Sequence, residues 1–153
     1  MSSLFFEDFQ AGQSFKSSGR TITETDLTFF SMLSGDWNPI HADAEYAATT
    51  RFGQRVVHGT LGIAVATGMM HEMGIFHLSV VAMLSLRERN FLKPLFVGDT
   101  IHLVLDVIST HPGTSARVGS IDRRLTLVNQ SGENVQQGYS EVLVLKKQSA
   151  KAQ

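Results

Sequence analysis

The chain has 153 residues, of which 42% are hydrophobic, and its 13 basic and 14 acidic side chains leave a net charge of −1. This balance excludes a global field that would draw the chain to nucleic acid or to a membrane surface. The size predicts one globular domain spanning residues 1–153, and the absence of cysteine excludes disulfides and thiolate chemistry.

Targeting signals are not evident at the N-terminus, which has no basic region leading into a long apolar run. The most apolar stretch, residues 61–70, is about half of the roughly twenty residues that a membrane span needs. We therefore expect no membrane partner and a cytoplasmic location.

The first third of the chain predicts a strand and then a helix. Residues 13–22 are expected to form the strand. Thr23 stands three residues before Asp26, which is a capping signal, and an apolar stripe of helical spacing follows. Because Pro39 disfavours helical geometry just before it, the helix should end near Gly35.

The turn after this helix carries the most informative side chains. Asp36 and His41 stand five residues apart across an Asn-Pro turn, a spacing that a turn can close although a helix would separate them. A carboxylate and an imidazole held together can move protons to and from a small molecule. The alternative is that Asp36 caps the loop and His41 is structural. A short helix should follow over residues 43–48, with Asp43 as its N-cap.

Residues 60–73 predict a helix of a different kind. The segment has no polar face, and a helix that is apolar all round is expected to be buried when it is too short to span a membrane. Gly62 and Gly68 keep the helix slim. Glycine inside a helix costs about 1 kcal/mol relative to alanine, so close packing against other backbone is the expected compensation.

The second half of the chain reads as strands. Apolar and polar residues alternate, with turn sequences at 111–114 and 129–132, and the expected strands cover 80–87, 100–107, 117–128 and 135–145. The alternation slips between Val118 and Leu125, so a bulge or twist is expected there. By periodicity alone this is an α+β protein with one buried helix.

Three segments resemble the MaoC-like dehydratases, which are also called (R)-specific or type 2 enoyl-CoA hydratases. They lie in the family's order between residues 33 and 101. The first is Leu-Ser-Gly-Asp-x-Asn-Pro-Ile-His (33–41), the second is Val-Val-His-Gly-Thr-Leu (56–61), and the third is Phe-Leu-Lys-Pro-Leu-Phe-Val-Gly-Asp-Thr-Ile (91–101). The resemblance implies a single hot-dog fold, in which an antiparallel sheet wraps round the buried central helix.

The resemblance also assigns roles to residues. It implies Asp36 and His41 as the catalytic pair, with Asp36 as the expected base and the division of the two roles left open. It implies that Gly59, directly before the apolar helix, supplies an oxyanion-binding N–H, where a helix N-terminus carries partial positive charge. Without the resemblance, Gly59 would simply turn the chain.

Four further residues have supporting roles in this prediction. Asn38 is expected to orient the turn, and Thr67 replaces the serine that usually bonds near the catalytic pair in the family. The alternative for Thr67 is a bond to a carbonyl one turn back. Met70 and Trp37 are candidates for the acyl pocket, although Met70 is equally well explained as core filling.

Arginines and Lys93 near these segments are candidates for binding the phosphates of coenzyme A, with solvated surface charge as the alternative.

The predicted function is therefore the reversible hydration of a trans-2-enoyl-CoA to an (R)-3-hydroxyacyl-CoA, with the acyl-CoA as substrate. No metal and no cofactor is implied, because the chain has no metal-ligand spacing, phosphate loop or nucleophile elbow. The family resemblance and the need to cover strand edges predict a homodimer with the acyl pocket near its interface.

Two rival functions stay open at this level. The first is another enzyme on the same fold, either a thioesterase or a dehydratase of acyl-carrier-protein thioesters. The second is a non-catalytic subunit that binds an acyl thioester. The presence of Asp36, His41 and Gly59 together argues against the second, since binding alone needs no acid–base pair.

Overall fold

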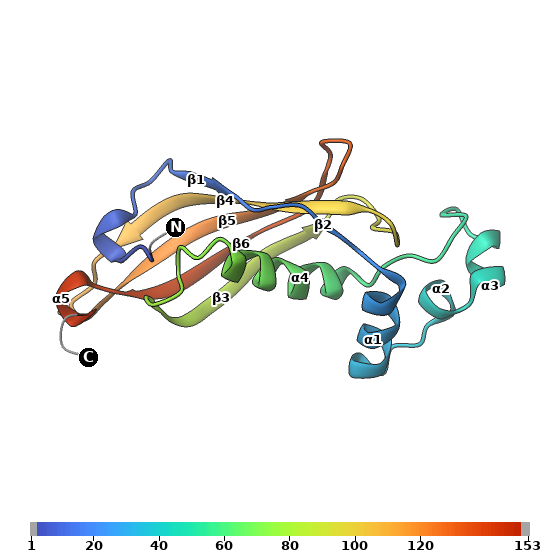
Figure 1. Ribbon diagram of the computed structural model, residues 1–153, viewed down its shortest axis with the longest axis horizontal. Coiled ribbons are helices and arrows are strands. Elements are labelled where there is room, and N and C mark those ends of the chain that lie inside the picture. Colours follow the sequence, from blue (N-terminus) through green and yellow to red (C-terminus); the bar gives the residue numbers. More distant parts are fainter. Residues whose placement is uncertain (1–2, 151–153) are drawn as a thin grey trace.

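A computed structural model describes residues 3–150 of the chain. Four long antiparallel strands form the sheet, in the order β4–β5–β6–β3, with β1 at the outer edge of β4 and β2 also pairing with β4. One helix, α4, lies along this sheet (Figure 1). The bounds are β1 (Ser14–Lys16), β2 (Arg20–Thr21), β3 (Val80–Phe91), β4 (Thr100–His111), β5 (Val118–Val128), β6 (Asn134–Leu145) and α4 (Gly59–Glu72).

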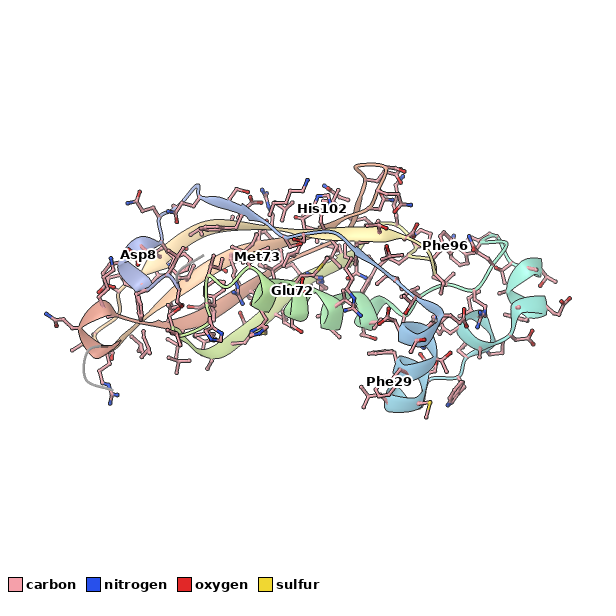
Figure 2. The ribbon with its side chains drawn as sticks, viewed as in Figure 1. Asp8, Phe29, Glu72, Met73, Phe96 and His102 are labelled. Carbon is pink, nitrogen blue, oxygen red and sulfur yellow. The ribbon has the colours of Figure 1, made fainter. Side chains whose placement is uncertain are left out.

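The core lies between α4 and the facing side of the sheet, as the alternation predicts. In β4 the buried residues Ile101, Leu103, Leu105 and Val107 alternate with less buried ones, and this pattern repeats in β5 and β6. At the end of α4, Met73 is buried in this core whereas Glu72 is exposed (Figure 2). Each such apolar side chain contributes about 1.5–3 kcal/mol on burial. The predicted hot-dog arrangement is confirmed.

The predicted first strand is divided into β1 and β2. Between them, the Ser17 N–H donates to the Leu103 carbonyl, and the Ser17 hydroxyl accepts from the Leu103 N–H. A side-chain oxygen thus replaces the backbone carbonyl in the ladder, and the regular pairing stops. Serine competes with the backbone in this way because its short hydroxyl reaches nearby amides.

Helix α4 departs from the prediction that it is buried all round. Its buried residues are Leu61, Gly62, Val65, Ala66, Met69 and Met70, which face the sheet. Ala64, Thr67 and Gly68 are exposed on the other side. The absence of a polar face therefore does not bury every side of this helix within one chain.

The bulge that the sequence predicts in β5 lies in the neighbouring strand β4. From Val118 to Leu127 the pairing of β5 with β6 continues without a shift. The extra residue is Ile108 of β4, opposite Asp122 and Arg123. The pattern in β5 only looked interrupted because Arg123 occupies an inward position where an apolar residue is expected.

The remaining helices are short and locally specified. Three of them, α1 (Glu24–Ser34), α2 (Pro39–Ala42) and α3 (Ala44–Thr49), lie together beyond one end of the sheet (Figure 1). The 3-10 helix η1 (Phe6–Asp8) and α5 (Lys147–Ala150) lie at the other end. No helix in residues 3–150 is long and apolar enough to cross a bilayer.

The predicted helix boundaries agree with the structure. Thr23 and Asp26 form a reciprocal capping box at the start of α1, and Gly35 ends it in the left-handed region at φ 74°. Asp43 caps α3 by accepting from the Tyr46 N–H. Phe29, on the outward side of α1, leaves 66% of its area exposed (Figure 2).

Candidate active site

The turn between α1 and α2 positions Asp36 and His41. After Gly35, one Asp36 carboxylate oxygen accepts from the Asn38 N–H at 3.1 Å, and the Asn38 side chain accepts from the Ile40 N–H at 3.1 Å. Asn38 is thus the N-cap of α2, with proline at the first helical position. The sequence prediction had a turn here and missed this single-turn helix. The α2 helix directs His41 back toward Asp36.

Asp36 and His41 converge without touching. The distance from Asp36 Oδ2 to His41 Nε2 is 3.9 Å, which is too long for a hydrogen bond. The other ring nitrogen of His41, Nδ1, lies 2.6 Å from the Val56 carbonyl. A carbonyl can only accept, so Nδ1 carries a proton and the His41 Nε2 faces Asp36. A small molecule can therefore be held between the carboxylate and the imidazole.

A second histidine, His58, completes the cluster and was not predicted as a site residue. Its ring stacks on His41 with centroids 3.7 Å apart, and its Nε2 lies 3.8 Å from Asp36 Oδ2. Only 3% of His58 is exposed. Its position directly before Gly59, inside the second family segment, is the signal that would have identified it.

The cluster of Asp36, His41 and His58 also has the donor set of a metal site, with ligand atoms within 4.8 Å of one another. His58 Nε2, however, lies 3.0 Å from the Asp36 backbone carbonyl. Since a carbonyl only accepts, this nitrogen carries a proton and has no lone pair for a metal. His58 is therefore not a ligand through Nε2, and Asp36 and His41 alone are fewer than the three protein ligands of typical catalytic zinc sites.

Gly59 opens α4 at the floor of the same cleft. The first N–H groups of a helix have no acceptor within it, so they point into the space before the helix. The Gly59 carbonyl accepts from the Gln136 side chain at 2.9 Å, which anchors the helix start to β6. A Cβ at Gly59 would lie 2.6 Å from the Phe91 ring, so a side chain here would displace that ring.

These groups share a cleft of about 550 Å³. Asp36, His41, His58 and Gly59 line it together with apolar residues, and Arg51 and Lys93 also lie on its wall. Three cations near the family segments are ion-paired: Lys93 pairs with Glu133, Arg55 pairs with Glu24, and Arg87 pairs with Asp122.

The remaining predicted residues lie outside this cleft. Thr67 Oγ1 donates to the Ala64 carbonyl at 2.6 Å, which is the alternative considered for it. Thr67 and Met70 line a second cleft of about 370 Å³. Trp37, which is 52% exposed, lines neither. Within one chain, Thr67, Met70 and Trp37 therefore do not join Asp36 and His41 in the first cleft.

Fold and site together define a hot-dog domain whose helix N-terminus meets an Asp–His pair. The MaoC like domain family model matches residues 8–129. The chain is 33% identical over 108 residues to the (R)-specific enoyl-CoA hydratase of Rhodospirillum rubrum, covering 71% of this chain and 72% of that one. It is 39% identical over 101 residues to Protein MaoC of Klebsiella aerogenes, of which it spans only 30%.

Solved structures of similar fold agree with the match to the MaoC like domain. The monoamine oxidase regulatory protein of Archaeoglobus fulgius superposes with a TM-score of 0.87 at 31% identity, covering 96% of this chain and 97% of that one. The R-hydratase of Pseudomonas aeruginosa gives 0.80 at 28% identity, covering 95% and 88%. The chain belongs to the MaoC-like family, which confirms the resemblance of its three segments. The named relatives of this family include hydratases and dehydratases.

Proposed function

We propose that this protein is a hydro-lyase that reversibly hydrates a trans-2-enoyl-CoA to an (R)-3-hydroxyacyl-CoA. The observation that carries the proposal is the convergence of Asp36 Oδ2 and His41 Nε2, 3.9 Å apart, beside the N-terminus of α4. Proton acceptor, proton donor and oxyanion donor then border one cleft, which is what addition of water to an unsaturated thioester requires.

The proposed step begins with water between the two side chains. Asp36 takes one proton from this water as its oxygen bonds to Cβ of the enoyl group. The double-bond electrons move onto the thioester oxygen, which accepts the Gly59 N–H. Protonated His41 gives its Nε2 proton to Cα, the enolate collapses, and proton transfer from Asp36 to His41 restores the starting state.

The pair is proposed to act without a metal or cofactor, since the proton on His58 Nε2 is directed to the Asp36 carbonyl. In this proposal His58 is a positioning residue. Its hydrogen bond holds the Asp36 backbone, and its ring stacks on His41.

A homodimer is part of the proposal because β3 is an exposed edge with exposed apolar side chains on it. These are Val80, Val81, Met83, Leu84, Leu86 and Phe91. Edge-to-edge pairing of β3 about a two-fold axis would cover them. Such long, apolar, unpaired edges otherwise promote aggregation.

The same axis would bring the two clefts together. Thr67 lies eight residues after Gly59, or about 12 Å along α4. A two-fold axis reverses directions perpendicular to it, and α4 runs along the sheet (Figure 1). The start of α4 in one chain then approaches the partner's Thr67 and the partner's Met70, which would form the far wall of the acyl pocket.

The test is hydration of crotonyl-CoA, followed by loss of the enoyl-thioester absorbance, with chiral analysis of the product. Asp36→Asn and His41→Ala should each lower the rate by about 10²–10⁴-fold. Asp43→Asn is the matched control, because asparagine caps α3 equally well and Asp43 lies outside the cleft. Longer enoyl-CoAs and acyl-carrier-protein thioesters extend the panel.

Three outcomes would contradict the proposal. Release of free thiol without hydration would indicate a thioesterase. Tight binding of acyl-CoA without turnover of any member of the panel would indicate a binding subunit. Full activity in both the Asp36 and His41 variants would remove these residues from the chemistry.

A further inference from the structure

An arginine lies on the core side of the sheet. Arg123 of β5 falls between the buried residues Ile121 and Leu125, and only 3% of it is exposed. A charged group on the inward face of a central strand is unfavourable unless something compensates the charge. Burial lowers the pKa of Arg123 to about 10, so it is still charged at neutral pH.

The chain offers this charge little compensation. One Arg123 nitrogen lies 3.4 Å from Ser140 Oγ, its guanidinium carbon lies 4.9 Å from the centre of the Phe76 ring, and Nε has no partner. In residues 3–150, no carboxylate lies within ion-pair distance of Arg123. Arg124, the next residue, is by contrast paired with Asp106 at 2.9 Å on the opposite face.

Arg123 also lines the second cleft, of about 370 Å³. The other residues that line it are Thr67, Met70, His71, Phe76, His77, Val80, Met83 and Val142. None of them is acidic. Apolar side chains supply most of this lining, and the imidazoles of His71 and His77 lie 5.8 Å apart. A ligand that fits would be apolar along its length with an anionic group at the arginine.

We propose that Arg123 is a specificity-determining residue that binds a carboxylate at the far end of the substrate's acyl group. The substrates would then be monothioesters of unsaturated dicarboxylic acids. This inference rests on the proposed function, because the proposed two-fold pairing would place the second cleft of one chain opposite the partner's catalytic pair. The planar guanidinium matches a carboxylate through two parallel hydrogen bonds, and a neutral acyl chain would leave them unmade.

Binding of saturated thioesters tests the inference without turnover. Three matched pairs are titrated calorimetrically: succinyl- against butyryl-CoA, glutaryl- against valeryl-CoA, and adipyl- against hexanoyl-CoA. At the chain length that fits, the carboxylated ligand should bind about 10- to 150-fold more tightly, as expected for a hydrogen bond to a charged group. Arg123→Met should abolish this preference, and Arg123→Lys should keep part of it. Arg124→Met is the control and should leave it unchanged.

Kinetics separates this inference from the proposed function. If the proposed function and this inference both hold, carboxylated enoyl-CoAs of the fitting length are hydrated with a higher kcat/KM than their neutral counterparts. Arg123→Met then reverses this order of kcat/KM values. A carboxylate preference in binding with no hydration of either series would overturn the proposed function alone. Hydration without preference at any length would overturn the inference alone. Dissociation of the Arg123→Met dimer with unchanged ligand preference would also overturn it, because a partner carboxylate would then compensate the charge.

Discussion

Substitution of Gly62 by alanine should destabilise this protein, although the same change stabilises most helices. Gly62 lies inside α4, where alanine is favoured over glycine by about 1 kcal/mol. A Cβ at this position would lie 2.8 Å from the Gln136 side-chain carbon. Gln136 is 2% exposed, so its amide cannot swing into solvent.

The displaced amide determines the sign of the effect. Gln136 donates to the Gly59 carbonyl at 2.9 Å and accepts from Arg89 at 3.2 Å. Leaving buried polar groups unpaired costs about 1–3 kcal/mol, and overpacking costs about 1–3 kcal/mol more. After subtracting the helix gain, Gly62→Ala should lose about 3 kcal/mol of unfolding free energy.

Urea denaturation at fixed protomer concentration measures this loss. With a slope of about 2 kcal/mol per molar urea, the midpoint should fall by about 1.5 M. The control is the same substitution in a Gln136→Ala background, where the Cβ meets no amide. There Gly62→Ala should stabilise by up to about 1 kcal/mol. A neutral or stabilising effect in the parent protein would refute the reasoning, because Gln136 would then yield at little cost.

Three further predictions concern the dimer interface, the stability of the fold at low pH, and activity without a metal ion. Leu84→Glu places a charge on the exposed edge and should shift the gel-filtration mass from a dimer to one 16.8 kDa chain; an unchanged dimer would argue for another interface. Partial burial raises the pKa of Asp26, but hydrogen bonds from Thr23 and the charge of Arg20 outweigh it and hold the pKa below 3.8. The stability that this carboxylate contributes is therefore present above pH 3.8 and is lost as pH falls through the folded pKa. In Asp26→Asn, the free energy of unfolding should therefore fall less steeply with decreasing pH below 3.8. An acid transition identical to that of the parent protein would contradict this prediction. Dialysis against EDTA should leave enoyl-CoA hydration unchanged, whereas activity that returns only with added metal would contradict the proposed metal-free acid–base mechanism.

Short-range interactions made several features predictable from the residues alone. Three helix caps use contacts within a few positions of the chain, so the local sequence identifies them directly. They are the capping box at Thr23, the C-cap at Gly35 and the N-cap at Asp43. The strands followed from their alternation, because one face of each packs on the core. Asp36 and His41 belong to the same local turn, which is why their proximity could be expected.

Contacts between distant segments were decided only by the tertiary structure. His58 reaches Asp36 from 22 positions away, and Ser17 divides the first strand by bonding to Leu103, 86 positions along the chain. In the sequence, Arg123 looked like a break in the strand pattern. Periodicity indicates which face of the sheet a residue occupies, but it does not indicate whether an acidic group lies near enough to compensate the charge of a buried arginine. The sequence by itself determined the family, the long strands, the helices α1, α3 and α4, and the Asp36–His41 turn. Packing across the sheet decided which groups join that turn and where an uncompensated charge lies, because burial depends on the whole chain.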